Sequence, residues 1–182
     1  DISPSRVKIG DKVILSGPIG NHGISIMSER NGLTFEPPVL SDTAPLNSLV
    51  RDMLKITKKV HAMRDPTRGG LATTLKEFAT DSGYCIVIEE KLIPVPSGVK
   101  GACELLGLDP LYVANEGILV AIVSPDVTGK LVNAMKKHPL GKDTRVIGEV
   151  RKAPEGMVLL KTSIGGTRIV EMLSGDQLPR IC

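Results

Sequence analysis

The stretch GILVAIV at residues 117–123 is the most apolar segment of the chain, and it decides the fold. A short apolar run rich in β-branched residues is typical of a buried strand rather than of a surface helix. A strand of this kind has to be covered, and the periodic segments on either side of it supply the covering layers.

Patterns typical of strands and helices alternate along the rest of the chain, without repeats. Further strands are expected at residues 12–16, 60–64, 85–88, 145–150, 157–160 and 167–172. Helices are expected at residues 22–31, about 44–58, about 70–83, 97–106 and around 127–135. This alternation of helices and strands predicts an α+β fold, or an α/β layered one, in which helices flank one mixed sheet.

Composition excludes several classes of function. The 182 residues fit one domain, and 41% hydrophobic with 24% charged residues are typical of a soluble globular protein. Aromatic residues at 2% argue against stacking on single-stranded nucleic acid, and a net charge of +3 is too small to indicate a polyanionic partner. No apolar run approaches the ~20 residues of a membrane span. Three widely spaced cysteines fit a reducing compartment, so we expect a cytoplasmic protein that binds neither nucleic acid nor membrane.

The two ends of the chain suggest a piece of a longer protein with a reactive tail. The chain begins with Asp1 rather than Met, so residues 1–10 are expected to end an interdomain linker and residues 11–172 to form the domain. Residues 173–182 are expected to be a mobile tail that ends on Cys182. Ten extended residues span at most about 33–36 Å, so the thiol could enter a pocket as a carrier arm. The alternative is an incidental cysteine at a frayed end.

The stretch RDPTRGG at residues 64–70 is the first of three places that could carry chemistry. Its two glycines let the backbone approach a ligand, and the free N–H groups of the helix that follows favour an anion. Thr67 and Arg68 add donors suited to phosphate oxygens. The alternative is an ordinary helix start with Asp65 as N-cap and Pro66 in the first turn.

The stretch SGPIGNHG at residues 16–23 is a second glycine-rich turn between a strand and a helix. It resembles a phosphate cradle loosely but lacks the P-loop lysine. His22 in this turn could bind phosphate or cap the helix, and capping is the favoured interpretation. His61 and His138 show no spacing typical of metal ligands, so no metal is assigned to them.

The third place is the Asn115-Glu116-Gly117 sequence at the mouth of the apolar strand. Burial beside this strand could raise the pKa of Glu116 and make it a general base. The alternative is a solvated glutamate at a strand end. Cys85 and Cys103 lie among apolar neighbours and are expected to be buried structural thiols.

Together these motifs resemble the HypE family of hydrogenase maturation factors. The resemblance rests on MRDPTRGGL at 63–71, VILSG at 13–17 with His22-Gly23, NEG at 115–117 and LPRIC at 178–182. HypE belongs to the ATP-using superfamily of aminoimidazole ribonucleotide synthase and selenophosphate synthetase. The terminal cysteine favours HypE, since selenophosphate synthetase carries its reactive residue near the N-terminus. The resemblance covers the whole chain but only the C-terminal portion of a full-length HypE.

The resemblance implies a definite chemistry. The carbamoyltransferase HypF would load a carbamoyl group onto Cys182, and ATP would drive dehydration of this thiocarboxamide to a thiocyanate. The cyano group would pass to iron held by the HypC–HypD complex. Glu116 would be the base, and the residues expected to bind ATP are Gly20, His22, Asp65, Thr67, Arg68, Gly69, Gly70 and Asn115.

The resemblance also places several functions in an N-terminal domain that precedes this chain in HypE. That domain would form the homodimer and supply a catalytic lysine and most of the Mg²⁺ ligands, so no metal ligand is expected in this chain. The chain alone is accordingly expected to be inactive. Two alternatives stay open: another ATP-dependent amide-activating synthase with an idle terminal cysteine, and a non-catalytic module that docks HypF or HypC–HypD.

Overall fold

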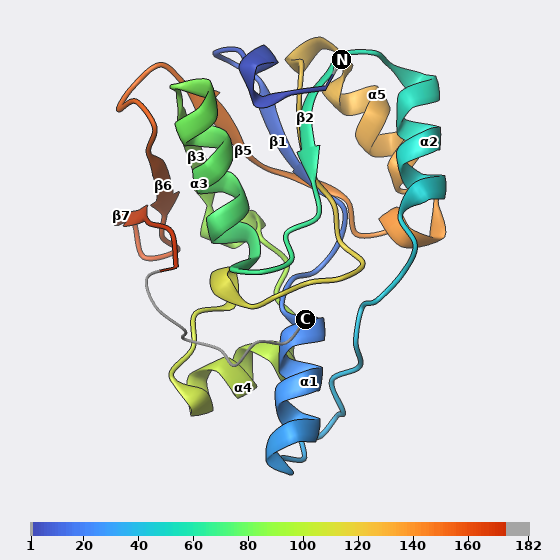
Figure 1. Ribbon diagram of the computed structural model, residues 1–182, viewed down its shortest axis with the longest axis vertical. Helices are drawn as coiled ribbons and strands as arrows, with labels where there is room; N and C mark the ends of the chain where they lie inside the picture. Colours follow the sequence, from blue (N-terminus) through green and yellow to red (C-terminus); the bar gives the residue numbers. More distant parts are fainter. Residues whose placement is uncertain (1, 174–182) are drawn as a thin grey trace.

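The computed structural model describes residues 2–173 and shows one seven-stranded mixed sheet with helices on both faces (Figure 1). The strand order is β2-β4-β1-β5-β3-β6-β7, and neighbours are antiparallel except for the parallel pair β3 and β6. The predicted fold class is confirmed, and a strand lies in each of the seven segments expected to form one. The strands are β1 Lys12–Leu15, β2 Val60–Arg64, β3 Cys85–Glu89, β4 Val120–Val123, β5 Arg145–Arg151, β6 Val158–Lys161 and β7 Thr167–Val170.

The helices form two layers and one end of the molecule. Helix α3 covers one face of the sheet, α2 and α5 cover the other, and α1 and α4 pack on each other beyond one end of the strands (Figure 1). The α-helices are α1 Asn21–Asn31, α2 Asn47–Ile56, α3 Gly70–Ser82, α4 Ser97–Leu106 and α5 Pro125–Met135. Short 3₁₀ helices are η1 Pro4–Arg6, η2 Glu90–Leu92, η3 Pro110–Tyr112 and η4 Pro139–Gly141.

The central strands divide their side chains between two apolar cores. In β1, Val13 and Leu15 belong to the core beneath α3, whereas Ile14 belongs to the core beneath α2 and α5. Strand β4 alternates in the same way. Successive strand side chains point to opposite faces, so a strand covered on both sides has no solvated face and is apolar throughout. This is why residues 120–123 contain no polar residue.

Two element boundaries differ from the predicted ones. Strand β4 begins at Val120, three residues later than expected, because the backbone at Gly117 lies against another loop instead of a neighbouring strand. Helix α2 begins at Asn47 rather than near Ala44. The reason is Pro45, which disfavours helical geometry in the residue before it.

The first residues of the described chain pack onto β2. The Ser3 N–H donates to the His61 carbonyl at 2.8 Å, and Val7 is buried in the core beneath α3. Asp11 and His61 form a buried pair, with 2.6 Å between Oδ2 and Nδ1. The role expected for residues 1–10 as the end of a linker stays a prediction. No helix within residues 2–173 is long and apolar enough to cross a membrane.

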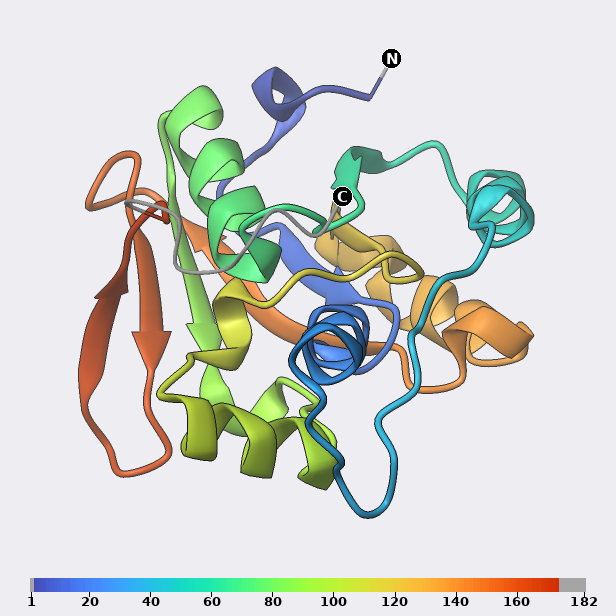
Figure 2. The same cartoon turned by 60° about the horizontal axis from the view of Figure 1, so that its bottom comes forward.

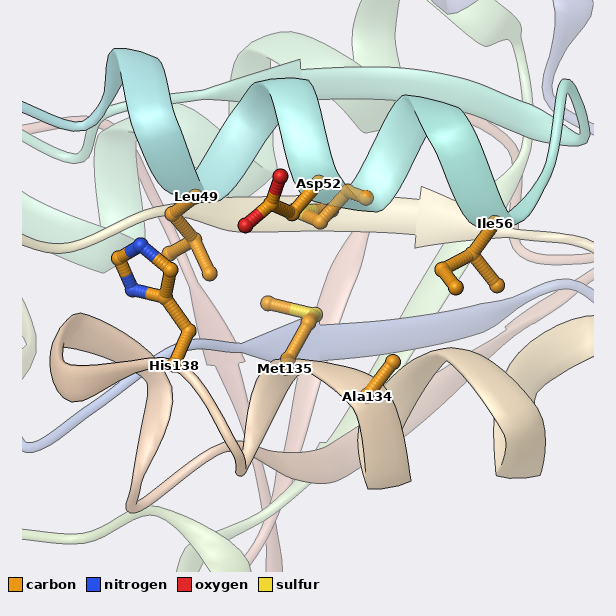
Figure 3. A pocket seen from close by; sticks show the side chains of 7 residues that line it. Leu49, Asp52, Ile56, Ala134, Met135 and His138 are labelled. Atoms are coloured by element: carbon orange, nitrogen blue, oxygen red, sulfur yellow. The ribbon is translucent and has the colours of Figure 1, made fainter.

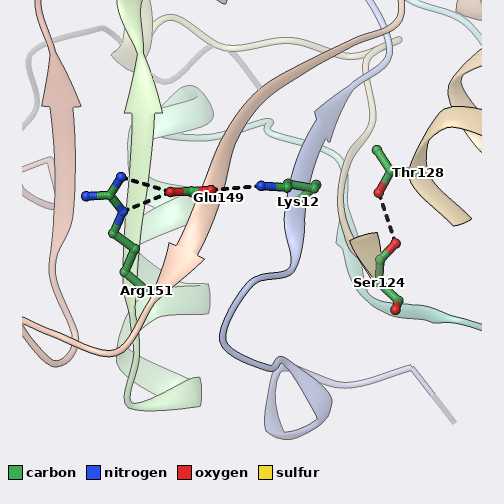
Figure 4. A network of polar contacts seen from close by, with 5 residues as sticks. All are labelled: Lys12, Ser124, Thr128, Glu149 and Arg151. Carbon is green, nitrogen blue, oxygen red and sulfur yellow. Dashed lines mark hydrogen bonds and ion pairs between the residues drawn. The ribbon is translucent and has the colours of Figure 1, made fainter. Parts of the chain in front are cut away.

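A row of charges crosses the sheet between β1 and β5. Lys12 lies opposite Glu149 in the β1–β5 register, and Glu149 accepts from Lys12 at 2.8 Å and from Arg151 at 2.9 Å (Figure 4). These two hydrogen bonds, Lys12 first, hold the pKa of Glu149 below its ordinary value. Exposed pairs of this kind each contribute at most about 1 kcal/mol. They support the strand register without deciding it.

Candidate functional site

A single buried amide joins three loops at the N-terminal ends of α1 and α3. Asn115 is fully buried, and its Oδ1 accepts from the Gly20 N–H at 2.7 Å. Its Nδ2 donates to the Pro66 carbonyl at 2.9 Å and to the Val113 carbonyl at 3.1 Å. The loop between η3 and β4 therefore runs between α1 and α3 and holds both helix starts (Figure 2). Both amide hydrogens of Asn115 are used within the protein.

The turn before α3 depends on two glycines. Gly69 and Gly70 have φ of +75° and +60°, the left-handed region in which a side chain is strained. A Cβ on Gly70 would lie 2.5 Å from the carbonyl oxygen of Leu111 and 2.7 Å from that of Val113. The backbone of α3 thus touches the loop that carries Asn115.

The interpretation of Asp65 as an N-cap with Pro66 in the first turn is wrong. Helix α3 begins at Gly70, and its N-cap is Gly69, which offers no side chain to the helix N–H groups. The local Asp-Pro signal is overridden because residues 65–69 form a loop that reaches Asn115. Asp65 and Arg68 are exposed on this loop, and Thr67 is half-buried.

The turn before α1 has the same construction. Its N-cap is Gly20, with φ +90° and no side-chain cap. His22 lies inside the helix, and its Nδ1 is 2.9 Å from the Ser41 hydroxyl, so the prediction that His22 caps α1 is wrong. The Gly23 N–H donates to the Ala114 carbonyl at 3.0 Å, which seats α1 on the loop of Asn115.

Glu116 lies half-buried beside Asn115, and its backbone is held by the connection between α1 and α2. The Glu116 N–H donates to Oδ1 of Asp42 at 3.2 Å. Asp42 belongs to the α1–α2 connection, residues 32–46, whose sequence has no periodicity. No sequence signal could have identified Asp42, since its partner lies 74 residues further along the chain.

The described residues supply donors suited to phosphate. The N-termini of α1 and α3 carry no side-chain cap and no acidic residue in the first turn, and Thr67 and Arg68 lie beside the second of them. Thr73 Oγ1, one turn into α3, is buried with no hydrogen-bond partner among the described residues. This donor set fits the phosphate oxygens of a nucleotide such as ATP. Within residues 2–173 no group of three or more His, Cys, Asp or Glu side chains could hold a metal ion.

Two of the three cysteines lie within the described residues. Cys85 and Cys103 are buried, which confirms their prediction as structural thiols. Burial raises the pKa of Cys85, and burial followed by the nearby Asp109 and Glu104 raises the pKa of Cys103 to about 11. Neither is an activated nucleophile. Cys182 and its tail lie outside the described residues.

A cavity of about 60 Å³ lies between α2 and α5, on the face opposite α3 (Figure 3). Its lining is mostly apolar and consists of Leu49, Asp52, Met53, Ile56, Ala134, Met135 and His138. Pockets that hold a cofactor are commonly about 300–1,000 Å³. This cavity is therefore a packing gap between two helices, separate from the loops around Asn115.

The comparison with protein families defines the class to which this fold and these loops belong. The family model described as AIR synthase related protein, C-terminal domain, matches residues 8–161. The chain belongs to this family.

Within that class the chain is similar throughout to HypE. It is 51% identical, over its whole length, to the carbamoyl dehydratase HypE of Bradyrhizobium diazoefficiens and covers 53% of that protein. A crystal structure of the hydrogenase maturation protein HypE in complex with ATP matches the whole chain with a TM-score of 0.94 and 41% identity, over 55% of that protein. A HypE–HypF complex matches 95% of the chain with a TM-score of 0.91 and 42% identity, over 56% of that protein.

These likenesses confirm the resemblance to HypE that the motifs indicated. They also set its extent, since the chain spans about half the length of the curated relatives it matches.

Proposed function

We propose that this domain serves, within a full-length protein of the family, the ATP-dependent dehydration of a carbamoyl group carried on Cys182. The observation that supports this most directly is the 51% identity over the whole chain to a carbamoyl dehydratase. The product would be a thiocyanate, the source of cyanide ligands for the iron of a nickel–iron hydrogenase. Cys182 is the carrier in this proposal because it belongs to the LPRIC motif at residues 178–182, by which the chain resembles HypE.

The chemistry requires that an amide lose oxygen. ATP supplies the phosphoryl group that turns the amide oxygen into a leaving group, so that one thiocarboxamide and ATP give one thiocyanate, ADP and phosphate. The amide nitrogen releases one proton to solvent when its oxygen is phosphorylated and gives the other to the base as phosphate departs and the triple bond forms. Glu116 is the proposed base, since it is the residue next to Asn115 in the loop that holds both helix starts.

The proposed phosphate contacts come from both helix starts. Thr67, Arg68, Gly69 and Gly70 would hold the phosphates at α3, with Asp65 on the same loop. His22 would contribute from α1, and Gly20 would shape the turn before it, since the Gly20 N–H is already donated to Asn115. The geometry supports this because Asn115 ties both helix starts to one loop, so that fixed N–H donors need no rearrangement when charge develops. A direct contact of Asn115 with ATP stays a prediction.

The proposed partners follow from the relatives. HypF is the proposed carbamoyl donor, and a HypE–HypF complex of similar structure supports it. HypC–HypD as acceptor, a homodimer through the N-terminal half, Mg²⁺ held mainly by that half, and a cytoplasmic location are proposals that rest on family membership. The alternative is a non-catalytic module that docks HypF or HypC–HypD.

Mass spectrometry of the C-terminal peptide tests the chemistry. The full-length protein that carries this chain is incubated with carbamoyl phosphate, HypF and ATP. We expect the Cys182 peptide to gain a carbamoyl group and then to lose water. Cys182→Ala should abolish both changes, whereas Cys103→Ala, a matched removal of a buried thiol, should retain them. Product from Cys182→Ala would refute the carrier role.

Glu116→Gln tests the base. The variant should bind ATP and accept the carbamoyl group but lose about 10²- to 10⁴-fold in the rate of dehydration, the range typical of general base catalysis. Single-turnover dehydration of preloaded protein measures this rate. Undiminished dehydration would show that another group takes the proton.

A further inference from the structure

The α1–α2 connection crosses the backbone of Glu116 and Gly117 at Asp42. The Asp42 Oδ1 accepts from the Glu116 N–H at 3.2 Å. A Cβ on Gly117 would lie 1.7 Å from the carbonyl oxygen of Asp42, which leaves room for glycine only. Asp42 therefore meets the turn of the proposed base through both its side chain and its backbone.

Asp42 is half-buried, although it lies in a connection between exposed neighbours. Its Oδ2 is buried and has no hydrogen-bond partner within the described part of the chain. Burial raises the pKa of Asp42 against the opposing effects of the backbone N–H groups and of His22. A buried oxygen without a partner costs stability, so its presence calls for a reason beyond folding.

The neighbours of Asp42 hold the other side of the same connection. Ser41 and Thr43 place hydroxyl oxygens 2.9 Å and 3.4 Å from Nδ1 of His22, in the first turn of α1. Residues 41–43 thus join α1 to the turn of Glu116. A shift of this connection would move Glu116 relative to the start of α1.

We propose that Asp42 is a positioning residue, which fixes the backbone of Glu116 and thereby the place of its carboxylate for dehydration. This inference rests on the proposed function of Glu116 as the base. Asp42 touches neither substrate nor nucleotide in this role. It acts by accepting one hydrogen bond and by holding the α1–α2 connection against Gly117.

The test uses the full-length protein that carries this chain, preloaded with the carbamoyl group, in single-turnover dehydration. Asp42→Ala should lower the dehydration rate about 10- to 100-fold, since a displacement of about 1 Å costs up to 10² in rate. The half-saturating ATP concentration should change less than about twofold, because the proposed phosphate contacts at the start of α3 are untouched. Asp42→Asn keeps an acceptor for the Glu116 N–H and should recover most of the rate.

Two further variants distinguish the position of the Asp42 acceptor atom from the charge of its carboxylate, and both from a non-specific effect of substitution. Asp42→Glu keeps the charge but displaces the acceptor, so it should be slow even if Asp42→Ala does not fold. Asp143→Ala removes an exposed carboxylate from the loop before β5 and should leave the rate unchanged. A fast Asp42→Glu with a slow Asp42→Asn would overturn the proposal, since charge rather than position would then matter.

A double variant ties Asp42 to Glu116. If Asp42 acts through Glu116, Asp42→Ala combined with Glu116→Gln should be no slower than Glu116→Gln alone. Multiplying losses would overturn the positioning role. An active Glu116→Gln would refute the base itself, whereas an inactive Glu116→Gln with a fully active Asp42→Ala would overturn only the present inference.

Discussion

The side-chain amide of Asn115 joins three loops of the candidate site by hydrogen bonds. Asn115→Ala leaves the Gly20 N–H and the Val113 carbonyl without this partner in the interior, whereas the Pro66 carbonyl still accepts from the Asn115 N–H at 3.2 Å. A buried polar group left without a partner costs about 1–3 kcal/mol, so we expect a loss of about 2–5 kcal/mol in the free energy of unfolding. Urea unfolding of the 182-residue chain measures it.

The control for this prediction is Asn133→Ala. Asn133 is exposed on α5, and a surface substitution of this kind usually changes stability by less than about 0.5 kcal/mol. Equal stabilities of the two variants would show that the loops hold together without the Asn115 amide.

Asp42 makes stability depend on pH in a direction that can be worked out. Its pKa in the folded protein is raised above the ordinary value of 3.8 by burial, so folding favours the neutral form. This contribution is fully present below the ordinary pKa and is lost as pH rises through the folded pKa. The melting temperature of the wild type should therefore fall relative to that of Asp42→Asn across this window.

Thermal melting between about pH 3 and pH 8 tests this sign, since the ordinary pKa of an aspartate lies near the lower limit. The two proteins can also differ in melting temperature by an amount that does not depend on pH. The test is therefore how the difference between their melting temperatures changes with pH. Nearby His22 favours the charged carboxylate and acts in the opposite direction. A wild type that gains stability over Asp42→Asn as pH rises would contradict the prediction.

At the scale of elements, α5 is held by its apolar side chains rather than by its exposed charges. Leu131 is fully buried in the core beneath α2 and α5. Leu131→Ala should lower the free energy of unfolding by about 2–5 kcal/mol, the usual cost of such a cavity. Lys130→Ala on the exposed side of the same helix should cost little. A small loss in Leu131→Ala would mean that α2 and α5 close over the gap.

The ends of the helices show which local sequence signals are enough to predict where a helix begins or ends. Helix α1 ends at Asn31, the residue at which the helix was expected to end, with Gly32 as its left-handed C-cap. Helix α3 begins at Gly70, where the helix was expected, although Asp65-Pro66 is a good local signal for an earlier start. Contacts of Gly70 with the carbonyls of Leu111 and Val113 outweigh it, and they link residues some 40 positions apart.

At the scale of the whole molecule, the described residues build one seven-stranded sheet with an apolar core on each face. Two cores fill both faces of the sheet, whereas no metal-binding group occurs within residues 2–173. We expect the 182-residue chain to unfold cooperatively, to bind ATP feebly and to show no ATP turnover. An ATPase assay beside the full-length protein measures this. Robust hydrolysis by the chain alone would refute the prediction.

The sequence by itself determined the fold class, the two glycine-rich turns, the NEG turn and the family, because these depend on local periodicity and on contiguous motifs. The tertiary structure alone decided that Asn115 joins the two turns and that Asp42 holds Glu116. The physical reason is that both contacts are side-chain hydrogen bonds between distant loops. Their energy depends on burial and distance, and neither leaves a periodic trace along the chain.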